Sequence, residues 1–521
     1  MAKLAIKSET SKSNSLFPIY LSNLIPQTHI VRVVDRVIDE LSLSKIYETY
    51  NGGGNSAFSP QTMLKVWVYA YLCNIYSSRK VEQALKENIN FMWLSGMTRP
   101  DYRTLNWFRG KRLKPHFDEI FTQIVVLLSE QGFVSLKVQY VDGTKLESCA
   151  NKYTFVWRGS VEKNDAKLKV RVAALLAKIE KDNNLSSDEM PSPEDMSVED
   201  FENRLSKIKS SIAEQRRTRQ ENKQIKEIEH KSLPKMKEYK ENLEKMGKRN
   251  SYSKTDEDAT FMRMKEDAML NGQLKPGYNM QMSTENQFIT HYMVFSNPTD
   301  YLTFTTYEDA FERRYQTHSD EITADSGYGS EQNYAYCEQK GITAFIKYPM
   351  FHKEQKKSFL QNPFLQNNLY YNRQEDYYVC PMGQHMEKVR DEIRISDGGY
   401  QSFVSIYIAK NCEGCPLRSM CHKSKSNRQI EVNHQLNAYR RQAGELLTSE
   451  EGVVRRSRRP IEPEAVFGQL KANEMFRRMR LRGMTGVSLE FGLKAMAHNI
   501  KKWHKRCLSI PITTIFARKS Y

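Results

Sequence analysis

The sequence lacks any apolar run that approaches the ~20 residues a transmembrane helix requires. Its N-terminal segment, Met1 to Pro18, is polar with scattered lysines and lacks the apolar stretch of a signal peptide. No internal repeat is recognisable. From these absences we expect a cytoplasmic protein without a membrane partner.

Acidic residues are scarce relative to basic ones. The chain has 79 Lys and Arg against 62 Asp and Glu, a formal net charge of +17 and a pI of about 9.2. Because most soluble enzymes lie nearer neutrality, this excess indicates a polyanionic partner: DNA, RNA or an anionic membrane. The 39% hydrophobic content fits a folded protein, and 521 residues are enough for several domains.

A reducing cytosol argues against disulfides among the eight cysteines. Four of them cluster, two as a C-x2-C pair, and four thiolates can hold a structural Zn²⁺ ion tetrahedrally. The alternative is a set of reduced cysteines in a small β-rich insertion, and His385 or His422 could replace one zinc ligand. The predicted ligands are Cys380, Cys412, Cys415 and Cys421.

The first part of the chain has helical patterning. Ser59-Pro60 is typical of a helix start, and apolar residues follow it at helical spacing. Because Trp67, Trp93 and Trp107 share that spacing, we expect them in the core rather than stacked on bases. The sequence therefore predicts an all-α N-terminal domain over residues 1–130, which we expect to bind DNA.

Strand-like alternation begins near Phe133. One strand is expected to end in Val141-Asp142-Gly143-Thr144, and a hairpin is expected over 278–295. Further strands are expected at 321–325, ending in Asp325, and at 343–347 beyond a helix. These elements predict an α/β catalytic core, a mixed sheet flanked by helices, over residues 131–521.

Two insertions interrupt the predicted core. Residues 160–260 are highly charged with apolar residues in 3-4 spacing, which is typical of a helical hairpin or short coiled coil. Residues 370–430 hold the cysteine cluster, and the chain beyond Ile461 is helical and very basic. The charged insertion is expected to be a solvated spacer without chemistry of its own.

Two strand-end aspartates and one helical glutamate suggest a metal site. Phosphodiester cleavage and transfer need a nucleophilic oxygen, a stabilised leaving oxygen and neutralised phosphate charge, which two Mg²⁺ ions can supply. Such ions require carboxylates that converge from separate elements, and Asp142 and Asp325 each end a predicted strand. Taken singly, either could instead be an ordinary turn or helix cap.

The third acid is less sharply defined. Glu464 lies near the start of a predicted helix and seven positions before Lys471, so the two share a face. One could bind metal while the other contacts DNA phosphate. Glu462 is a rival for the same role, and a plain helix N-terminus, where Glu favours the dipole, would also account for the pattern.

Together these residues resemble the bacterial insertion-sequence transposases of the DDE type. The resemblance covers nearly the whole chain, and six motifs occur in the family's order. The helical N-terminal part carries Phe58-Ser59-Pro60 with Ser77-Ser78-Arg79-Lys80, and Trp93-Leu94-Ser95-Gly96 with Pro100-Asp101-Tyr102-Arg103-Thr104. The strand region carries Val141-Asp142-Gly143-Thr144, Lys275-Pro276-Gly277-Tyr278 and Ala324-Asp325-Ser326-Gly327-Tyr328. The C-terminal part carries Glu464-Ala465-Val466-Phe467-Gly468-Gln469-Leu470-Lys471 with Ala497-His498-Asn499.

This resemblance implies a ribonuclease H-like core and catalytic residues Asp142, Asp325 and Glu464 that bind two Mg²⁺ ions, for which Mn²⁺ can substitute. It also implies hydrolysis at transposon ends, followed by attack of the 3′-hydroxyl on target DNA, by a homodimer on paired ends. One departure concerns a Tyr-x2-Arg-x3 pattern that often precedes the Glu. Pro460 takes that Arg position and no Tyr precedes it, so Arg456, Arg458 or Arg459 would have to substitute.

Basic residues flank the predicted catalytic helix and recur in the N-terminal domain. Clusters beside a metal site are typical of contacts to the phosphate backbone; the alternative is solvated helix faces. Two other functions fit the same residues: a host-recruited DNA-binding protein without catalysis, and a ribonuclease H-like nuclease that cuts without joining. The predicted DNA contacts are Lys471, Arg456, Arg458, Arg459, Arg477 and Arg478, with Arg79, Lys80 and Arg103 in the N-terminal domain.

Overall fold

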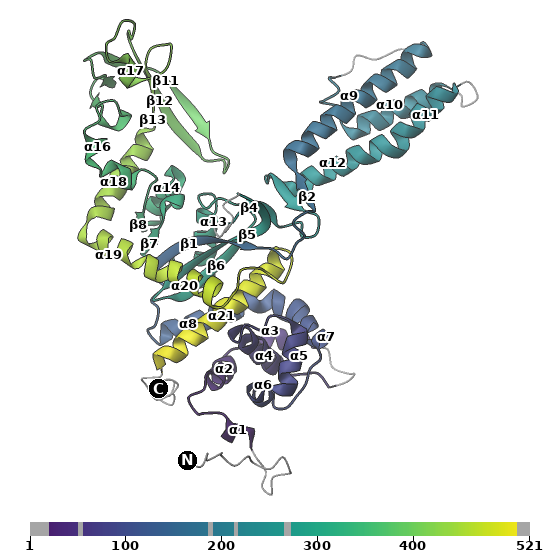
Figure 1. Cartoon of the computed structure of the whole chain (residues 1–521), viewed down its shortest axis with the longest axis vertical. Helices are drawn as coiled ribbons and strands as arrows, with labels where there is room; N and C mark the ends of the chain where they lie inside the picture. The colour runs from purple at the N-terminus through teal and green to yellow at the C-terminus, as the bar shows by residue number, and fades with distance from the viewer. Residues whose placement is uncertain (1–19, 51–55, 186–190, 213–216, 265–271, 508–521) are drawn as a thin grey trace, which may run out of the picture. The chain divides into compact units, whose positions relative to one another are not determined.

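The computed structural model describes residues 20–50, 56–185, 191–212, 217–264 and 272–507. The chain divides into two compact units (Figure 1). Unit 1 comprises Met1–Ser135, Phe288–Thr290 and Leu489–Tyr521, and unit 2 comprises Leu136–Gln287 and His291–Ser488. Among the described helices, none is long and apolar enough to cross a membrane.

In its described residues, unit 1 is helical apart from its loops and Phe288–Thr290, which belong to strand β6 (Phe288–Phe295), and its N-terminal part has the helices that its patterning predicted. Helix α4 (Pro60–Leu72) begins at the expected proline, and its Trp67 is fully buried and donates to the Leu105 carbonyl at 3.2 Å. Trp107 is 51% exposed, so its predicted core position was wrong; the Arg112 guanidinium covers its ring. The other principal helices are α2 (Ile30–Asp39), α5 (Ser78–Glu87), α6 (Ile89–Leu94), α7 (Tyr102–Trp107), α8 (Phe117–Glu130) and most of α21 (Met484–Cys507).

Unit 2 is built on a mixed sheet, so the mixed α/β core that the sequence predicted is present. The sheet has the order β4-β5-β1-β7-β8, and β6 also pairs with β5. Strand β1 is antiparallel to β5 and parallel to β7, which is parallel to β8. The bounds are β1 (Val138–Glu147), β4 (Thr260–Arg263), β5 (Leu274–Glu285), β6 (Phe288–Phe295), β7 (Glu321–Ala324) and β8 (Thr343–Ile346).

The predicted hairpin is confirmed as β5 and β6. Asn286 and Gln287 join the two strands, and both have positive φ, of 54° and 63°. Two consecutive left-handed residues match the right-handed twist of a two-residue hairpin. This turn becomes important below, because Glu462 bonds to it.

Helices cover this sheet through a shared apolar core. Ile322 and Phe345 on the parallel strands are fully buried against side chains from neighbouring helices. Phe304, Tyr334 and Leu447 supply the helical side of that core. The helices are α13 (Phe304–Tyr315), α14 (Glu331–Lys340) and α18 (His434–Thr448).

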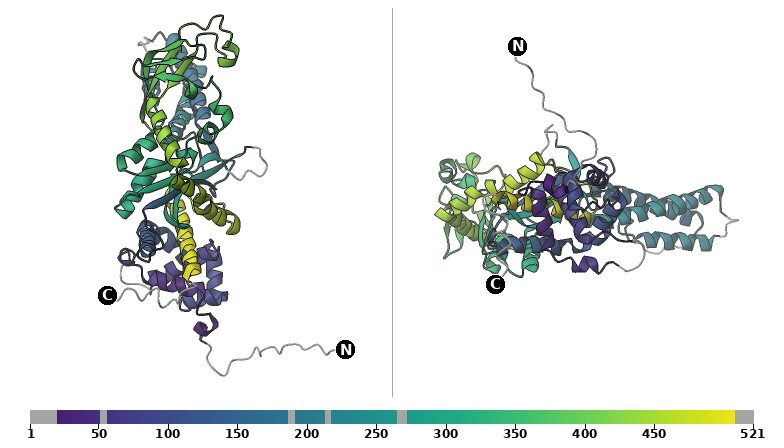
Figure 2. Two further views of the ribbon diagram at one scale, coloured as in Figure 1. Left: turned by 90° about the vertical axis from the view of Figure 1, so that its left-hand side faces the viewer. Right: turned by 90° about the horizontal axis from the view of Figure 1, so that it is seen from below.

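The first insertion is a helical bundle rather than a single hairpin. Its helices pack around one apolar core and run alongside one another (Figure 2). A buried ion pair crosses it, in which Arg204 donates to Glu180 at 2.7 and 2.6 Å. Several amphipathic stretches, not two, therefore share this core. They are α9 (Arg158–Asp182), α10 (Val198–Ser211), α11 (Arg219–Glu227) and α12 (Leu233–Met246), with β2 (Phe155–Trp157) paired to β3 (Ser251–Ser253) at the base.

The second insertion contains an antiparallel sheet with its own small core. The strand order is β13-β12-β11-β10-β9. Tyr378, Tyr407 and Ile430 are buried between its strands, with Cys412 beside them. The bounds are β9 (Tyr370–Asn372), β10 (Tyr377–Val379), β11 (His385–Ile395), β12 (Gln401–Ala409) and β13 (Gln429–Val432).

Candidate active site

Asp142 and Asp325 lie on neighbouring parallel strands. The register pairs Tyr140 with Thr323, and each aspartate follows its member of that pair by two residues. The two carboxylates therefore leave the sheet side by side. Asp142 is 5% exposed, whereas Asp325 is more open and its Oδ1 accepts from the Gly327 N–H at 2.8 Å.

The guanidinium of Arg459 joins the three predicted acids. Its Nη2 lies 3.0 Å from Asp142 Oδ1 and 3.5 Å from Asp325 Oδ2. Its Nη1 donates to Glu464 Oε1. Arg459 is itself buried, and its Nε has no hydrogen-bond partner. One desolvated cation thus lies among three carboxylates from three different elements.

A π-helical turn, η7 (Pro460–Glu464), places Arg459 and Glu464 on the same side. The N–H after it, on Ala465, bonds to the Pro460 carbonyl five residues back. Pro463 has no N–H to bond the Arg459 carbonyl, which disfavours a regular α-turn here. In a π-turn, residues five apart lie on the same side, so Arg459 lies on the same side as Glu464. In a regular α-helix that place belongs to the residue four positions before the glutamate, which here is Pro460.

Neither of the other two arginines considered for this position contacts the acids. The Arg456 guanidinium lies over the Phe351 ring, 5.2 Å from its centroid. Arg458 is exposed on α19 (Glu450–Arg458). Of the three, the structure brings Arg459 alone to the carboxylates.

Glu462 and Glu464 face different surroundings. Glu462 is buried, and its Oε2 accepts from Thr284 Oγ1 at 3.1 Å and from the Gln287 N–H at 2.7 Å. It therefore fastens the π-turn to the β5–β6 hairpin. Glu464 is 44% exposed on the side chain and shares Arg459 with the aspartates. Only the latter is placed to join a site with Asp142 and Asp325.

Two family models match the chain. Residues 379–504 match the model described as Transposase DDE domain, and residues 19–111 match Transposase domain (DUF772). These matches support the resemblance of the chain to the insertion-sequence DDE transposases. No curated protein and no solved structure matches it. The matched DDE segment contains Glu464, whereas Asp142 and Asp325 precede it.

The transposase has a further cation at this site that sequence reasoning missed. Lys347 follows β8, and its backbone N–H bonds to the Ala324 carbonyl at 3.4 Å, next to Asp325. Burial, together with the charges of Arg459 and Arg456, lowers the pKa of Lys347, and Asp325 and Glu464 oppose that shift. Its position at the end of the strand parallel to β7 was the signal that would have found it.

The negative charge of the site also affects the pKa of a nearby tyrosine, Tyr328. Burial raises the pKa of Tyr328 well above its usual value, and the charges of Asp300, Asp142 and Asp325 raise it further. Its hydroxyl donates to Gln281 Oε1. Asp300 is thus another carboxylate in this region that the sequence patterns did not indicate.

The predicted DNA-contacting residues of unit 2 differ in exposure. Lys471 is buried, and its Nζ donates to the Lys145 carbonyl at 3.1 Å. Arg477 and Arg478 are exposed, although Arg478 Nε donates to the Ser148 carbonyl at 3.0 Å. The surface therefore presents the two arginines, whereas the lysine is turned into the protein.

In unit 1, the three predicted DNA contacts are all exposed. Arg79 and Lys80 lie on α5, and Arg103 lies on α7. The Arg79 and Arg103 guanidinium groups both approach the Tyr102 ring, at 5.0 and 5.7 Å from its centroid. Tyr102 therefore holds two cations together on one surface.

The four clustered cysteines line one small cavity of about 20 Å³. Cys412 Sγ accepts from the Arg428 N–H at 3.3 Å, and Cys421 Sγ accepts from Arg428 Nη1 at 3.1 Å. Both ring nitrogens of His422, which lines the same cavity, are buried without hydrogen bonds. Across the described residues, no group of three or more His, Cys, Asp or Glu side chains is arranged to hold a metal ion.

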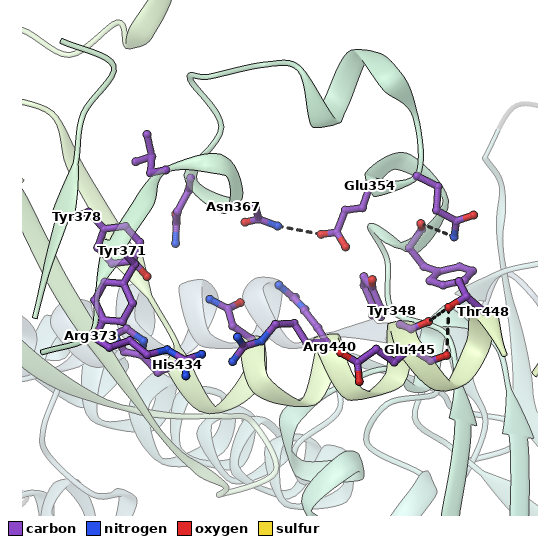
Figure 3. Close-up of a pocket in the computed structure, with 17 residues that line it drawn as sticks. Tyr348, Glu354, Asn367, Tyr371, Arg373, Tyr378, His434, Arg440, Glu445 and Thr448 are labelled. Atoms are coloured by element: carbon purple, nitrogen blue, oxygen red, sulfur yellow. Dashed lines mark hydrogen bonds between the residues drawn. The ribbon is translucent and has the colours of Figure 1, made fainter. Parts of the chain in front are cut away.

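A larger cavity, about 940 Å³, lies between α18 and the second insertion (Figure 3). His434, Arg440 and Glu445 line it along the helix, and Asn367 and Glu354, joined by a 2.9 Å hydrogen bond, lie opposite. Its lining is aromatic and of mixed charge. It contains none of the site residues predicted from sequence.

Proposed function

We propose that this transposase cleaves DNA at transposon ends and transfers the strands to target DNA in a Mg²⁺-dependent reaction. Asp142, Asp325 and Glu464 are the catalytic acids. The observation that carries this proposal is their convergence on the single buried guanidinium of Arg459. Three carboxylates brought together from separate elements repel one another unless a cation lies among them.

The strand order supports a ribonuclease H-like core for this reaction. Strands β6, β5 and β1 follow one another in the sheet, and the parallel strands β7 and β8 extend it from β1. The two aspartates leave this sheet from adjacent strands, and the glutamate approaches from a helical segment. This arrangement gives the acids independent supports, which fixes their relative positions.

The chemistry of the donor set, although not its arrangement around Arg459, fits divalent metal ions of the hard type. Carboxylate oxygens are the ligands that Mg²⁺ prefers, and Asp142, Asp325 and Glu464 would hold it. When bound, Mg²⁺ would supply Lewis-acid stabilisation of phosphate charge and a more nucleophilic oxygen. Arg459 is a buried cation among these acids, and its positive charge compensates theirs.

Basic side chains around the acids would hold the DNA. Arg459 and Lys347 lie beside the carboxylates, where they can neutralise the phosphate at the reacting bond. The exposed Arg477 and Arg478 are proposed to contact the backbone further along the duplex. In unit 1, the exposed Arg79, Lys80 and Arg103 would bind transposon ends, and a homodimer would pair two ends.

The test is an assay with the full chain, DNA carrying the element's own ends, Mg²⁺ and a target plasmid. Joined products support transposition, cuts alone indicate a nuclease, and neither indicates a binding protein without catalysis. Asp142→Asn should abolish both cutting and joining. The matched control is Asp320→Asn, since Asp320 is 61% exposed at the start of the neighbouring strand. Full activity of the Asp142 variant would contradict the assignment.

We also propose structural Zn²⁺ in the second insertion, held by Cys380, Cys412, Cys415 and Cys421. The support is that all four thiols line one cavity, where Arg428 now donates to two of the sulfurs. Thiolates release their protons on binding zinc, and the metal then stabilises the fold. Zinc content of the full chain should be one ion per molecule and be lost in a Cys412→Ser variant. Zinc-free protein from zinc-supplemented growth would contradict this.

A further inference from the structure

Asp300, in the loop between β6 and α13, lies against the segments that carry both aspartates of the proposed site. Its Oδ1 accepts from Asn279 Nδ2 at 2.7 Å and from Gln281 Nε2 at 2.8 Å. Both amide residues belong to β5, which pairs with β1, and both are buried. Two neutral donors therefore hold one carboxylate oxygen in place.

Glycines beside the two aspartates leave the room that Asp300 occupies. A Cβ atom at Gly143, directly after Asp142, would lie 2.7 Å from Asp300 Oδ1 and 2.4 Å from Gln281 Nε2. A Cβ atom at Gly327, two residues after Asp325, would lie 3.6 Å from Asp300 Oδ2. A larger residue at Gly143 would therefore require the Asp300 and Gln281 side chains to move from these positions.

The charge of Asp300 has no cationic partner in the part of the chain that the structure describes. Its Oδ1 partners are uncharged amides, and its Oδ2 accepts no hydrogen bond there. The other three acids, in contrast, share Arg459. A carboxylate held beside others without a counter-charge raises the free energy of the folded protein unless a cation arrives. An asparagine would make the same Oδ1 contacts at no such cost.

We propose that Asp300 is a fourth carboxylate of the active site, whose negative charge strengthens the binding of divalent cations by Asp142, Asp325 and Glu464. The inference rests on the proposed function. Asn279 and Gln281 act as positioning residues, because they orient the Asp300 carboxylate from β5. Gly143, directly after Asp142, permits its close approach.

Asp300→Asn removes the negative charge of residue 300 and keeps the packing of its side chain. The substituted amide keeps an oxygen that can accept from Asn279 and Gln281, and it has nearly the same shape. The measurement is a Mn²⁺ titration of the full, DNA-free chain, in which electron paramagnetic resonance counts the free ion. We expect about tenfold weaker binding, the size typical of losing a group that supports metal ligands. Asp320→Asn serves as the control and should bind like the unaltered protein.

Asp142→Asn in the same titration distinguishes a failure of the Asp300 proposal from a failure of the proposed metal site. If Asp142→Asn weakens Mn²⁺ binding and Asp300→Asn does not, Asp300 is a structural residue and the inference is wrong. If neither variant changes the binding, the metal site itself is wrong, and the inference fails with it. Should Asp300→Asn fail to fold, as judged by thermal denaturation, Asp300→Ser provides a smaller uncharged acceptor, and the same two outcomes decide.

Discussion

Arg459 and Asp142 form an ion pair in which Nη2 lies 3.0 Å from Oδ1, and both side chains are at most 10% exposed. The two residues are 317 positions apart in the sequence. Their pairing ties the π-turn before Glu464 to the central strand β1. This pair therefore holds Arg459, and with it the segment that carries Glu464, beside Asp142.

Replacing Arg459 should weaken the metal-free protein. Arg459→Ala removes the ion pair that Arg459 makes with the buried Asp142, so we expect the free energy of unfolding to fall by about 3–5 kcal/mol. Mg²⁺ should raise the melting temperature of this variant more than that of the unaltered protein, because its carboxylates have no competing cation. Thermal denaturation with and without Mg²⁺ measures both effects. Arg458→Ala, at an exposed position, is the control. An equal response to Mg²⁺ in both proteins would show that Arg459 does not occupy the cation position.

Substitution of Glu464 should affect catalysis, whereas substitution of Glu462 should affect stability. Glu464→Gln should abolish strand cleavage and lower the unfolding free energy less than Glu462→Gln does, because 44% of the Glu464 side chain is exposed and the amide oxygen can still accept from Arg459. Glu462→Gln should cost about 1–3 kcal/mol, because Thr284 Oγ1 and the Gln287 N–H lose a charged acceptor. Cleavage assays and urea denaturation of both variants provide the measurements. The assignment of the third acid is wrong if Glu462→Gln, while folded, is the inactive one.

The π-turn should be necessary for activity. Pro463→Ala restores an N–H that can bond the Arg459 carbonyl, which favours a regular helix and turns Arg459 away from Glu464. We expect cleavage to fall about 100-fold, as for other small displacements of catalytic groups. Adding Pro460→Arg should restore part of the activity, because a regular helix aligns residue 460 with Glu464. If Pro460→Ala restores cleavage as well as Pro460→Arg does, the alignment of an arginine with Glu464 is not the reason for the rescue.

A buried carboxyl outside the site should make stability depend on pH. Burial raises the pKa of Glu308 from 4.5 to about 8, against a 2.8 Å hydrogen bond from Gln139. The folded protein then keeps a proton that the unfolded chain releases, so stability is full below about pH 4.5 and is lost as the pH rises toward 8. The loss attributable to Glu308 should be on the order of 3 kcal/mol by neutral pH.

Urea denaturation at about pH 5 and about pH 8 tests this dependence. Glu308→Gln should lose less stability across that range than the unaltered protein does. Glu450→Gln, at an exposed glutamate of α19, should behave like the unaltered protein. Parallel pH profiles for all three proteins would mean that Glu308 is ionised in the folded state.

Local patterns were sufficient to predict the elements that carry the aspartates. Alternating apolar residues and a turn at Asn286 and Gln287 are short-range signals, so the hairpin and the strand before Asp142 could be located from sequence. The two candidate aspartates followed from these strands, although β1 continues past Asp142 to Glu147 and only Asp325 directly follows its strand. These signals depend on neighbours in the chain, which a sequence displays directly.

Other features depend on contacts that no local pattern encodes. Asp300 and Lys347 are single polar residues in loops. Only the pairing of strands that are distant in the sequence brings them close to the predicted acids. Arg459 could not be chosen over Arg456 and Arg458, because helical spacing assumes a regular turn and Pro463 alters it. Trp107 followed the helical spacing yet lies on the surface, since spacing alone does not say which face meets a neighbour.

The first insertion has a consequence for how the chain folds. Strands β1 and β5 are adjacent in the sheet, yet the whole helical bundle separates them in the sequence. Closing so long a loop is slow if the intervening chain is unstructured. The pairing of β2 with β3 at the base of the bundle holds the two exits of the insertion together. A bundle that collapses first would shorten the effective loop, so the central sheet would form late and at a rate set by the insertion.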